Sequence, residues 1–171
     1  MPDGWSVRFT GLVPVFYNAD AQVAKSVAKA IARGGCRLLE FTNRGDFAPE
    51  VFKELSLYCR KEVPEMILGV GTIMDAPTAA LYVAYGANFV VGPILNEEVA
   101  RFCNRRKIPY SPGCGSASEI AQAEELGVDM RWNSLGRERR SWLMTWEEIV
   151  LGKEGRLVLR RKSSRKSRQW V

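Results

Sequence analysis

A carboxylate and an arginine stand at the end of one short apolar segment of this 171-residue chain. Residues 38–44 read LLEFTNR, with Glu40 inside the segment and Arg44 four residues later. The segment follows two glycines and precedes a helix-like stretch, which predicts a buried strand ending here. A charged side chain at a buried strand end costs folding free energy unless it is paired or has a functional role. Two interpretations stay open at this point: a functional site, or a solvent-exposed strand end at which Glu40 pairs with Arg44.

Three later stretches also end predicted strands with small or reactive residues, and together they favour a site. They are residues 69–72 (GVGT), 92–93 (GP) and 111–116 (SPGCGS). Glycines such as Gly71 let backbone N–H groups approach a ligand closely. Thr72 offers a hydroxyl and Arg44 a bidentate fork, both suited to a carboxylate. Glu40 can accept and donate protons at the apolar opening of the predicted barrel, where burial is expected to raise its pKa.

The elements that must position these residues alternate regularly along the chain. Strands are predicted to begin near residues 12, 37, 66, 88, 108 and 128. Helical periodicity fills the intervals, at residues 23–31, 49–61, 77–85, 97–105 and 118–126. Short loops between alternating strands and helices predict a parallel sheet with crossover helices. An open doubly wound sheet and a (β/α)8 barrel both fit, and the reactive strand ends favour the barrel, because barrel enzymes place their chemistry there.

The composition excludes several classes of site. The chain has no histidine, which removes His-based triads and His general bases. The four cysteines are widely spaced, so we expect free buried thiols and neither a metal site nor a disulfide framework. No apolar run is long enough to span a bilayer and the N-terminus lacks the regions of a signal peptide, so we expect a cytoplasmic protein without membrane contact.

The composition changes abruptly near residue 130. Residues 131–171 hold twelve basic and four acidic residues, a net charge of +8, which leaves −2 for residues 1–130 of a chain whose total is +6. Four of the five tryptophans also lie after residue 130. We therefore expect a barrel portion at 1–130 and a divergent basic tail at 131–171, with a weak helix at 142–151 and a short strand at 157–159. A shifted reading frame from about residue 131 is our hypothesis for this change.

Four motifs in residues 11–130 resemble one family. They are 35–44 (GCRLLEFTNR), 61–72 (KEVPEMILGVGT), 86–93 (GANFVVGP) and 108–113 (IPYSPG), the last continuing to SEI at 118–120. In order and spacing they resemble the 2-keto-3-deoxy-6-phosphogluconate aldolases, which also act as 4-hydroxy-2-oxoglutarate aldolases. The resemblance implies a (β/α)8 barrel, usually trimeric, that cleaves a 2-keto-4-hydroxy acid into pyruvate and an aldehyde through a lysine Schiff base, without a cofactor.

The same resemblance implies roles for particular residues. Glu40 matches the family's general acid/base, Arg44 and Thr72 match residues that hold the pyruvate carboxylate, and Pro93 matches a proline at the mouth of the site. Gly71 lies in the same motif as Thr72 and is expected to bind substrate. The implied small-molecule partner is a pyruvate-type keto acid.

The chain departs from the family after the fifth strand. The family's lysine should fall at position 132, where this chain has Trp132, and no lysine lies between Lys107 and Lys153. Lys107 precedes the fifth strand, so we expect it on the opposite rim. The family's glycine-rich phosphate loops after strands seven and eight have no counterpart.

Three functional hypotheses therefore stay open. The chain is an aldolase, or a catalytically inactive homologue that binds small carboxylates or pairs with intact subunits, or a basic-tailed binding protein. For the tail itself, a nucleic-acid or membrane-surface arm competes with a disordered extension, and no nucleic-acid motif elsewhere supports the arm. An incomplete barrel also has open sheet edges, which predicts marginal stability and a tendency to associate.

Overall fold

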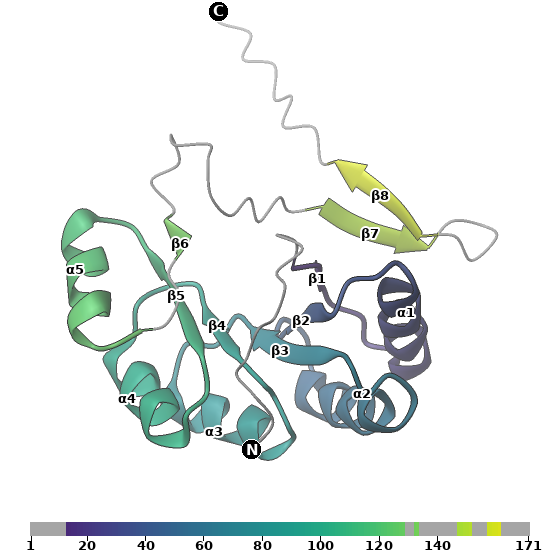
Figure 1. The fold of residues 1–171 in the computed structure, drawn as a ribbon, viewed down its shortest axis with the longest axis horizontal. Helices are drawn as coiled ribbons and strands as arrows, with labels where there is room; N and C mark the ends of the chain where they lie inside the picture. The colour runs from purple at the N-terminus through teal and green to yellow at the C-terminus, as the bar shows by residue number, and fades with distance from the viewer. Residues whose placement is uncertain (1–12, 129–131, 134–146, 152–156, 162–171) are drawn as a thin grey trace, which may run out of the picture.

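A parallel sheet with its strands in chain order forms the centre of the molecule. The computed structural model describes residues 13–128, 132–133, 147–151 and 157–161. The strands of the sheet are β1 (Val15–Phe16), β2 (Leu38–Thr42), β3 (Ile67–Gly71), β4 (Val90–Gly92), β5 (Tyr110–Cys114) and β6 (Trp132–Asn133). Each strand pairs in parallel with the next, in the order β1-β2-β3-β4-β5-β6 (Figure 1).

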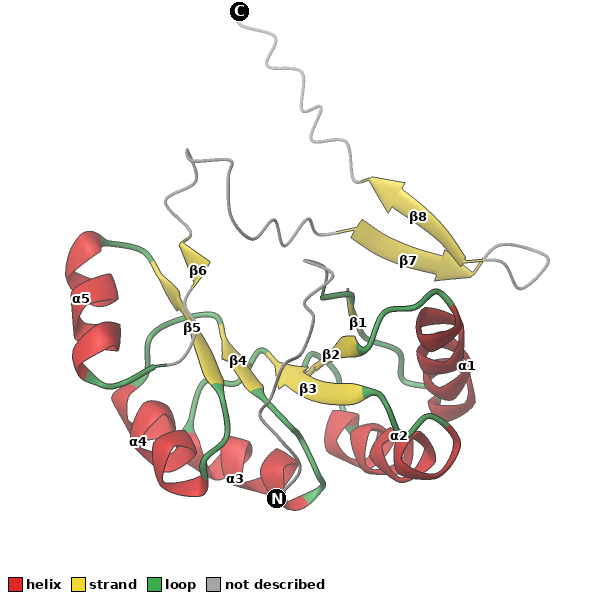
Figure 2. Ribbon diagram, in the orientation of Figure 1, coloured by secondary structure: helices red, strands yellow, loops and turns green. Residues whose placement is uncertain are grey.

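Helices connect the strands and lie together along the outer side of the curved sheet (Figure 2). They are α1 (Ala21–Arg33), α2 (Ala48–Glu62), α3 (Ala76–Ala84), α4 (Glu97–Arg106) and α5 (Ala117–Glu125). A doubly wound sheet reverses its strand order and carries helices on both faces. Consecutive order with helices on one side is instead the arrangement of a (β/α) barrel, so the structure confirms an incomplete barrel of the TIM type.

Polar side chains cap α1, α3, α4 and α5, whereas α2 begins without a side-chain cap. Asp20 caps α1 by accepting a hydrogen bond from the backbone N–H of Gln22 at 2.7 Å. Ser116 caps α5 in the same way, by accepting from the Glu119 N–H at 3.2 Å. Such caps satisfy backbone donors that have no partner inside the helix.

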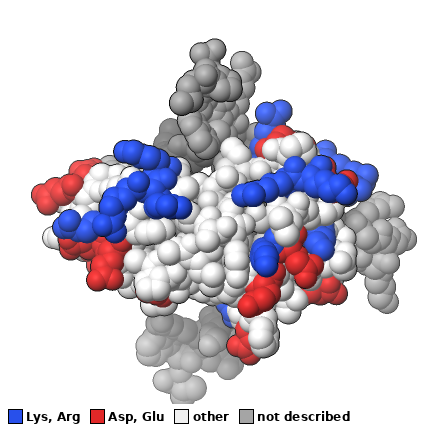
Figure 3. Space-filling view, turned by 90° about the horizontal axis from the view of Figure 1, so that it is seen from below, with Lys and Arg blue, Asp and Glu red and all other residues white. Residues whose placement is uncertain are grey.

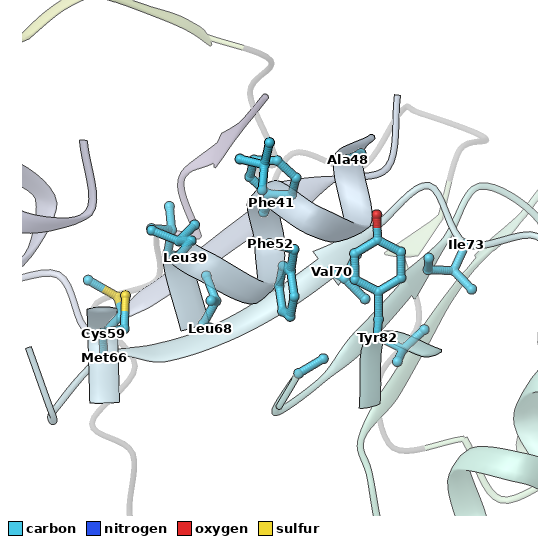
Figure 4. Close-up of a cluster of buried hydrophobic side chains, with 14 of the residues drawn as sticks. Leu39, Phe41, Ala48, Phe52, Cys59, Met66, Leu68, Val70, Ile73 and Tyr82 are labelled. Carbon is cyan, nitrogen blue, oxygen red and sulfur yellow. The ribbon is translucent and has the colours of Figure 1, made fainter. Parts of the chain in front are cut away.

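The main core lies between the sheet and the helices. It contains Leu39 and Phe41 from β2, Leu68 and Val70 from β3, and Phe52 from α2, all fully or almost fully buried (Figure 4). Because side chains alternate along a strand, the neighbouring positions face the barrel interior. There Leu38, Phe89 and Val91 pack together. Gly69 makes room for this cluster, since a Cβ at that position would overlap the Phe89 ring.

The C-terminal part differs from one expectation and agrees with another. Residues Glu147–Leu151 form the strand β7, so the predicted weak helix at 142–151 is wrong over these positions, and its remainder lies outside the described residues. Strand β7 pairs antiparallel with β8 (Leu157–Arg161), which confirms the predicted strand at 157–159. Antiparallel pairing of β-branched and leucine residues outweighs the local helical pattern here.

Strand boundaries also differ by a few residues at the edges of the sheet. The first strand, expected to begin near residue 12, is Val15–Phe16 within the described residues, because Pro14 lacks the N–H that would extend the ladder. The sixth strand, expected to begin at Val128, is Trp132–Asn133, and residues 129–131 lie outside the described ranges.

Within the described ranges, no helix is both long enough and apolar enough to cross a membrane. Over the same residues, no three or more His, Cys, Asp or Glu side chains lie close enough together to hold a metal ion.

Candidate active site

Glu40 is a buried carboxylate on the interior face of the sheet. Strand β2 places it between Val15 of β1 and Gly69 of β3, and the residue is only 4% exposed. Its Oε2 atom has no hydrogen-bond partner within the part of the chain that the structure describes. Burial raises the pKa of the Glu40 carboxyl from 4.5 to about 7, and the charge of Arg44 acts in the opposite direction. The carboxyl can therefore both accept and donate a proton near neutral pH.

Gly71 allows this carboxylate to lie against β3. A Cβ at position 71 would overlap Oε1 of Glu40, so only glycine fits at this place without displacing the side chain. The sequence predicts Gly71 as a site residue, and the structure brings it into direct contact with Glu40.

Arg44 and Thr72 lie beside each other at the carboxyl ends of β2 and β3. The Nε–H of Arg44 donates to Oγ1 of Thr72 at 3.4 Å. Arg44 is exposed and Thr72 is half-buried, so both polar groups face the rim near the buried carboxylate. A guanidinium and a hydroxyl at this distance form a suitable pair of donors for a substrate carboxylate.

Pro93 directly follows β4 and is exposed at the same end of the sheet. It lies on the same rim of the sheet as the other four predicted residues, because the carboxyl ends of parallel strands meet there. Those residues are Glu40, Arg44, Gly71 and Thr72. Sequence reasoning thus identifies a group of four residues in contact or close together and one residue on the same rim.

Two polar residues beside this group, Asn43 and Tyr82, were missed by sequence reasoning. The Tyr82 hydroxyl donates to Oδ1 of Asn43 at 2.8 Å. The available signal is weak: a tyrosine at a buried position of a helix needs a hydrogen-bond partner, and an asparagine at a strand end can supply one.

Position 132, where the resemblance expects the family's lysine, lies on β6. Its backbone pairs with Gly113 of β5 and the residue is Trp132. The lysines of residues 13–128 lie on helices or at a helix end, and none follows a strand. They are Lys25 and Lys29 of α1, Lys53 and Lys61 of α2, and Lys107 at the end of α4. Lys107 precedes β5 and so lies at the rim opposite to Arg44.

The face seen from below gives little support for a nucleic-acid site. In the view from below, basic and acidic side chains lie intermixed on both sides of an uncharged area (Figure 3). A nucleic-acid site usually shows a continuous basic stripe. The basic run of residues 162–171 lies outside the described residues.

Comparison with known proteins agrees with the geometry. A family model described as KDPG and KHG aldolase matches residues 6–131. The KHG/KDPG aldolase of Escherichia coli K12 is 33% identical over 124 residues, which cover 72% of this chain and 56% of that protein. The 2-dehydro-3-deoxy-phosphogluconate aldolase of Treponema pallidum is 34% identical over 119 residues, covering 70% of this chain and 55% of that protein.

Solved structures give the same result. The 2-keto-3-deoxy-6-phosphogluconate aldolase of Zymomonas mobilis, solved with 3-phosphoglycerate, is 31% identical with a TM-score of 0.61, over 68% of this chain and 54% of that one. The KDPG aldolase of Legionella pneumophila, with pyruvate captured as a covalent carbinolamine, is 27% identical with a TM-score of 0.62, over 68% and 55%. The chain spans about half the length of the curated relatives it matches. With its strand order, its rim residues and this match over most of its length, the chain belongs to the KDPG and KHG aldolase family.

Proposed function

We propose that this chain is a carbon–carbon lyase that cleaves 2-keto-3-deoxy-6-phosphogluconate or 4-hydroxy-2-oxoglutarate into pyruvate and an aldehyde. The observation that carries the proposal is the buried Glu40 carboxyl, with its pKa raised to about 7, beside the Arg44–Thr72 pair. The names of the relatives supply the substrate class.

The proposed roles follow from the chemistry of aldol cleavage. Arg44 and Thr72 bind the carboxylate of the keto acid, which fixes the carbon chain over the rim. Glu40 accepts the proton of the C4 hydroxyl as the C3–C4 bond breaks, and the electron pair of that bond moves to C3. The aldehyde leaves, and the proton on Glu40 is then available to C3, which yields pyruvate. A carboxyl that titrates near pH 7 is suited to both transfers.

The cleavage also needs an electron sink at C2, which an imine with a lysine would supply: the imine forms with loss of water, and its hydrolysis after C3 is protonated would release pyruvate and regenerate the amine. The Legionella relative was captured with pyruvate as a carbinolamine, the species that precedes an imine. Trp132 carries no amine, so in this proposal the amine comes from a lysine outside the described ranges or from another subunit. Lys153, Lys162 and Lys166 are the lysines of the chain that lie there.

Trp132 favours a second candidate function, a protein that binds pyruvate-type keto acids at the same rim without turnover. Both candidates share the roles of Arg44 and Thr72 and differ only in the covalent step. For both candidate functions we expect a homotrimer located in the cytoplasm. The molar mass in solution tests the trimeric state.

Borohydride reduction in the presence of pyruvate, followed by intact-mass spectrometry, separates the candidates. The lyase predicts one reduced pyruvate adduct, which peptide mapping then assigns to a lysine, together with pyruvate release from 4-hydroxy-2-oxoglutarate. The matched variant is Trp132→Lys, which places an amine at the position paired with Gly113.

The outcomes are distinct. An adduct on Trp132→Lys but not on the wild type would support keto-acid binding without turnover. If neither protein is labelled, while an intact family aldolase treated in parallel is, and the wild type does not bind pyruvate in calorimetry, both candidates are refuted.

A further inference from the structure

Asn43 connects the two strands that carry the candidate site. It lies between Thr42, the last residue of β2, and Arg44. Its backbone N–H donates to the carbonyl oxygen of Gly71 at 2.9 Å, so the first residue beyond β2 is fixed to the last residue of β3. Arg44 and Thr72 each directly follow one partner of this hydrogen bond.

Tyr82 of α3 forms a hydrogen bond with the side chain of Asn43 from the helical layer beside the sheet. It lies on α3, is fully buried, and packs edge-on against Phe52 with 5.0 Å between the ring centroids. Its ring belongs to the core shown in Figure 4, where its hydroxyl is drawn on the side of Ala48. That hydroxyl donates to Oδ1 of Asn43 at 2.8 Å. Because the Tyr82 hydroxyl is buried and Asn43 is half-buried, removing either partner of this hydrogen bond leaves the other without its partner and costs folding free energy.

The hydroxyl remains a donor throughout the physiological range. Burial raises the pKa of Tyr82 well above its ordinary value, and the charges of Glu50 and Tyr17 act in the same direction. The ring cannot move to another position without disturbing Phe52 and the core beneath it, so the donor is fixed in place as well as in protonation state.

A chain of contacts therefore runs from the core to the rim. It passes from Phe52 to Tyr82, from Tyr82 to Asn43, and from Asn43 to the ends of β2 and β3. At the end of this chain of contacts, the Arg44 Nε–H donates to Thr72 Oγ1 at 3.4 Å. This hydrogen bond is long, so its geometry depends on the positions of the segments that follow β2 and β3.

We propose that Tyr82 is a positioning residue for carboxylate recognition, which acts through Asn43 to hold Arg44 and Thr72 in register at the rim. The inference rests on the proposed function in one respect, namely that this rim binds a keto acid. Tyr82 touches neither Arg44 nor the ligand in this scheme. Its contribution is the preorganisation of two donors, which lowers the cost of ordering them when the carboxylate binds.

The test is Tyr82→Phe, which removes one oxygen and keeps the ring in the core. The control is Tyr58→Phe, the same chemical change at a half-buried position of α2. Tyr82→Phe should weaken pyruvate binding about 3- to 10-fold, the equivalent of one lost hydrogen bond. It should also speed hydrogen exchange of the Asn43 amide relative to that of Val70, and lower the heteronuclear NOE of the Arg44 Nε–H. Tyr58→Phe should change none of these.

The NMR arm needs no ligand, so it separates the two proposals. Unchanged Asn43 exchange and unchanged Arg44 order in Tyr82→Phe would overturn the inference, whether or not pyruvate binds. A faster exchange with unaltered pyruvate affinity would also overturn it, by reducing Tyr82 to a purely structural role. Failure of the wild type to bind pyruvate would refute the proposed function, and the Arg44 NOE would then decide whether Tyr82 positions that side chain.

Discussion

Replacing Glu40 with glutamine should stabilise the protein in a pH-dependent way. The Glu40 pKa is about 7 in the folded protein and 4.5 as the reference value, a difference that burial causes. The folded state therefore retains a proton between these pH values that the unfolded state has lost. Because the unfolded state binds fewer protons there, stability falls as the pH rises. The favourable contribution of protonated Glu40 is complete below about pH 4.5 and is lost as the pH passes 7.

The magnitude follows from the two pKa values. A difference of about 2.5 pKa units corresponds to about 3 kcal/mol of unfolding free energy at pH 8, at 1.36 kcal/mol per unit. Glu40→Gln has nearly the same shape and no charge to bury. Its stability relative to wild type should therefore increase by about 3 kcal/mol between pH 4.5 and pH 8, which corresponds to several degrees in Tm for a chain of this length.

Urea unfolding at pH 5, 6, 7 and 8, with the midpoint and the slope fitted separately, measures this difference. Glu65→Gln, at an exposed position before β3, is the matched control for the loss of one carboxylate from the net charge. A difference between Glu40→Gln and wild type that stays constant from pH 5 to pH 8 would refute the reasoning. Such a result would mean that Glu40 is solvated or paired in solution.

Three further predictions follow from the same site and core. Gly71→Ala should destabilise the protein by about 1–3 kcal/mol in urea unfolding and abolish activity, because the new Cβ displaces the Glu40 carboxylate; full activity in this variant would contradict that contact. Arg44→Lys should weaken pyruvate binding about tenfold in calorimetry, since the ammonium cannot offer a bidentate fork, and an unchanged Kd would remove Arg44 from the site. Phe52→Ala should lower the unfolding free energy by about 3–5 kcal/mol, because Phe52 is fully buried between Phe41 and Tyr82; a loss below 1 kcal/mol would mean that the core collapses around the gap.

Most of the barrel portion could be predicted from the sequence because its strands are almost wholly apolar and four of its five helices, all but α2, begin at a polar capping residue. Residues such as Leu39 and Val70 are buried between sheet and helices, so they appear as short apolar runs between turn signals. The site could be predicted to the extent that its residues follow these runs directly, as Arg44 and Thr72 do.

The features of the fold and site that could not be predicted depend on contacts between residues that are distant in sequence. The bond from Tyr82 to Asn43 joins residues 39 positions apart, and no local pattern indicates it. The strand β7 depends on its pairing with β8, so its own segment resembles a weak helix. Marginal stability of the open sheet stays a prediction, and the boundary near residue 130 does as well.

Thr72 adopts a left-handed backbone conformation, with a φ of 64°, which is rare for a β-branched residue. This conformation costs about 1–2 kcal/mol relative to glycine. Glycine, however, loses about 1 kcal/mol more backbone entropy on folding, so Thr72→Gly should be almost neutral for stability. The fold therefore exerts little preference for threonine over glycine at this position. What distinguishes them is the hydroxyl, so at position 72 a melting curve is uninformative and a ligand titration measures the whole effect of the substitution.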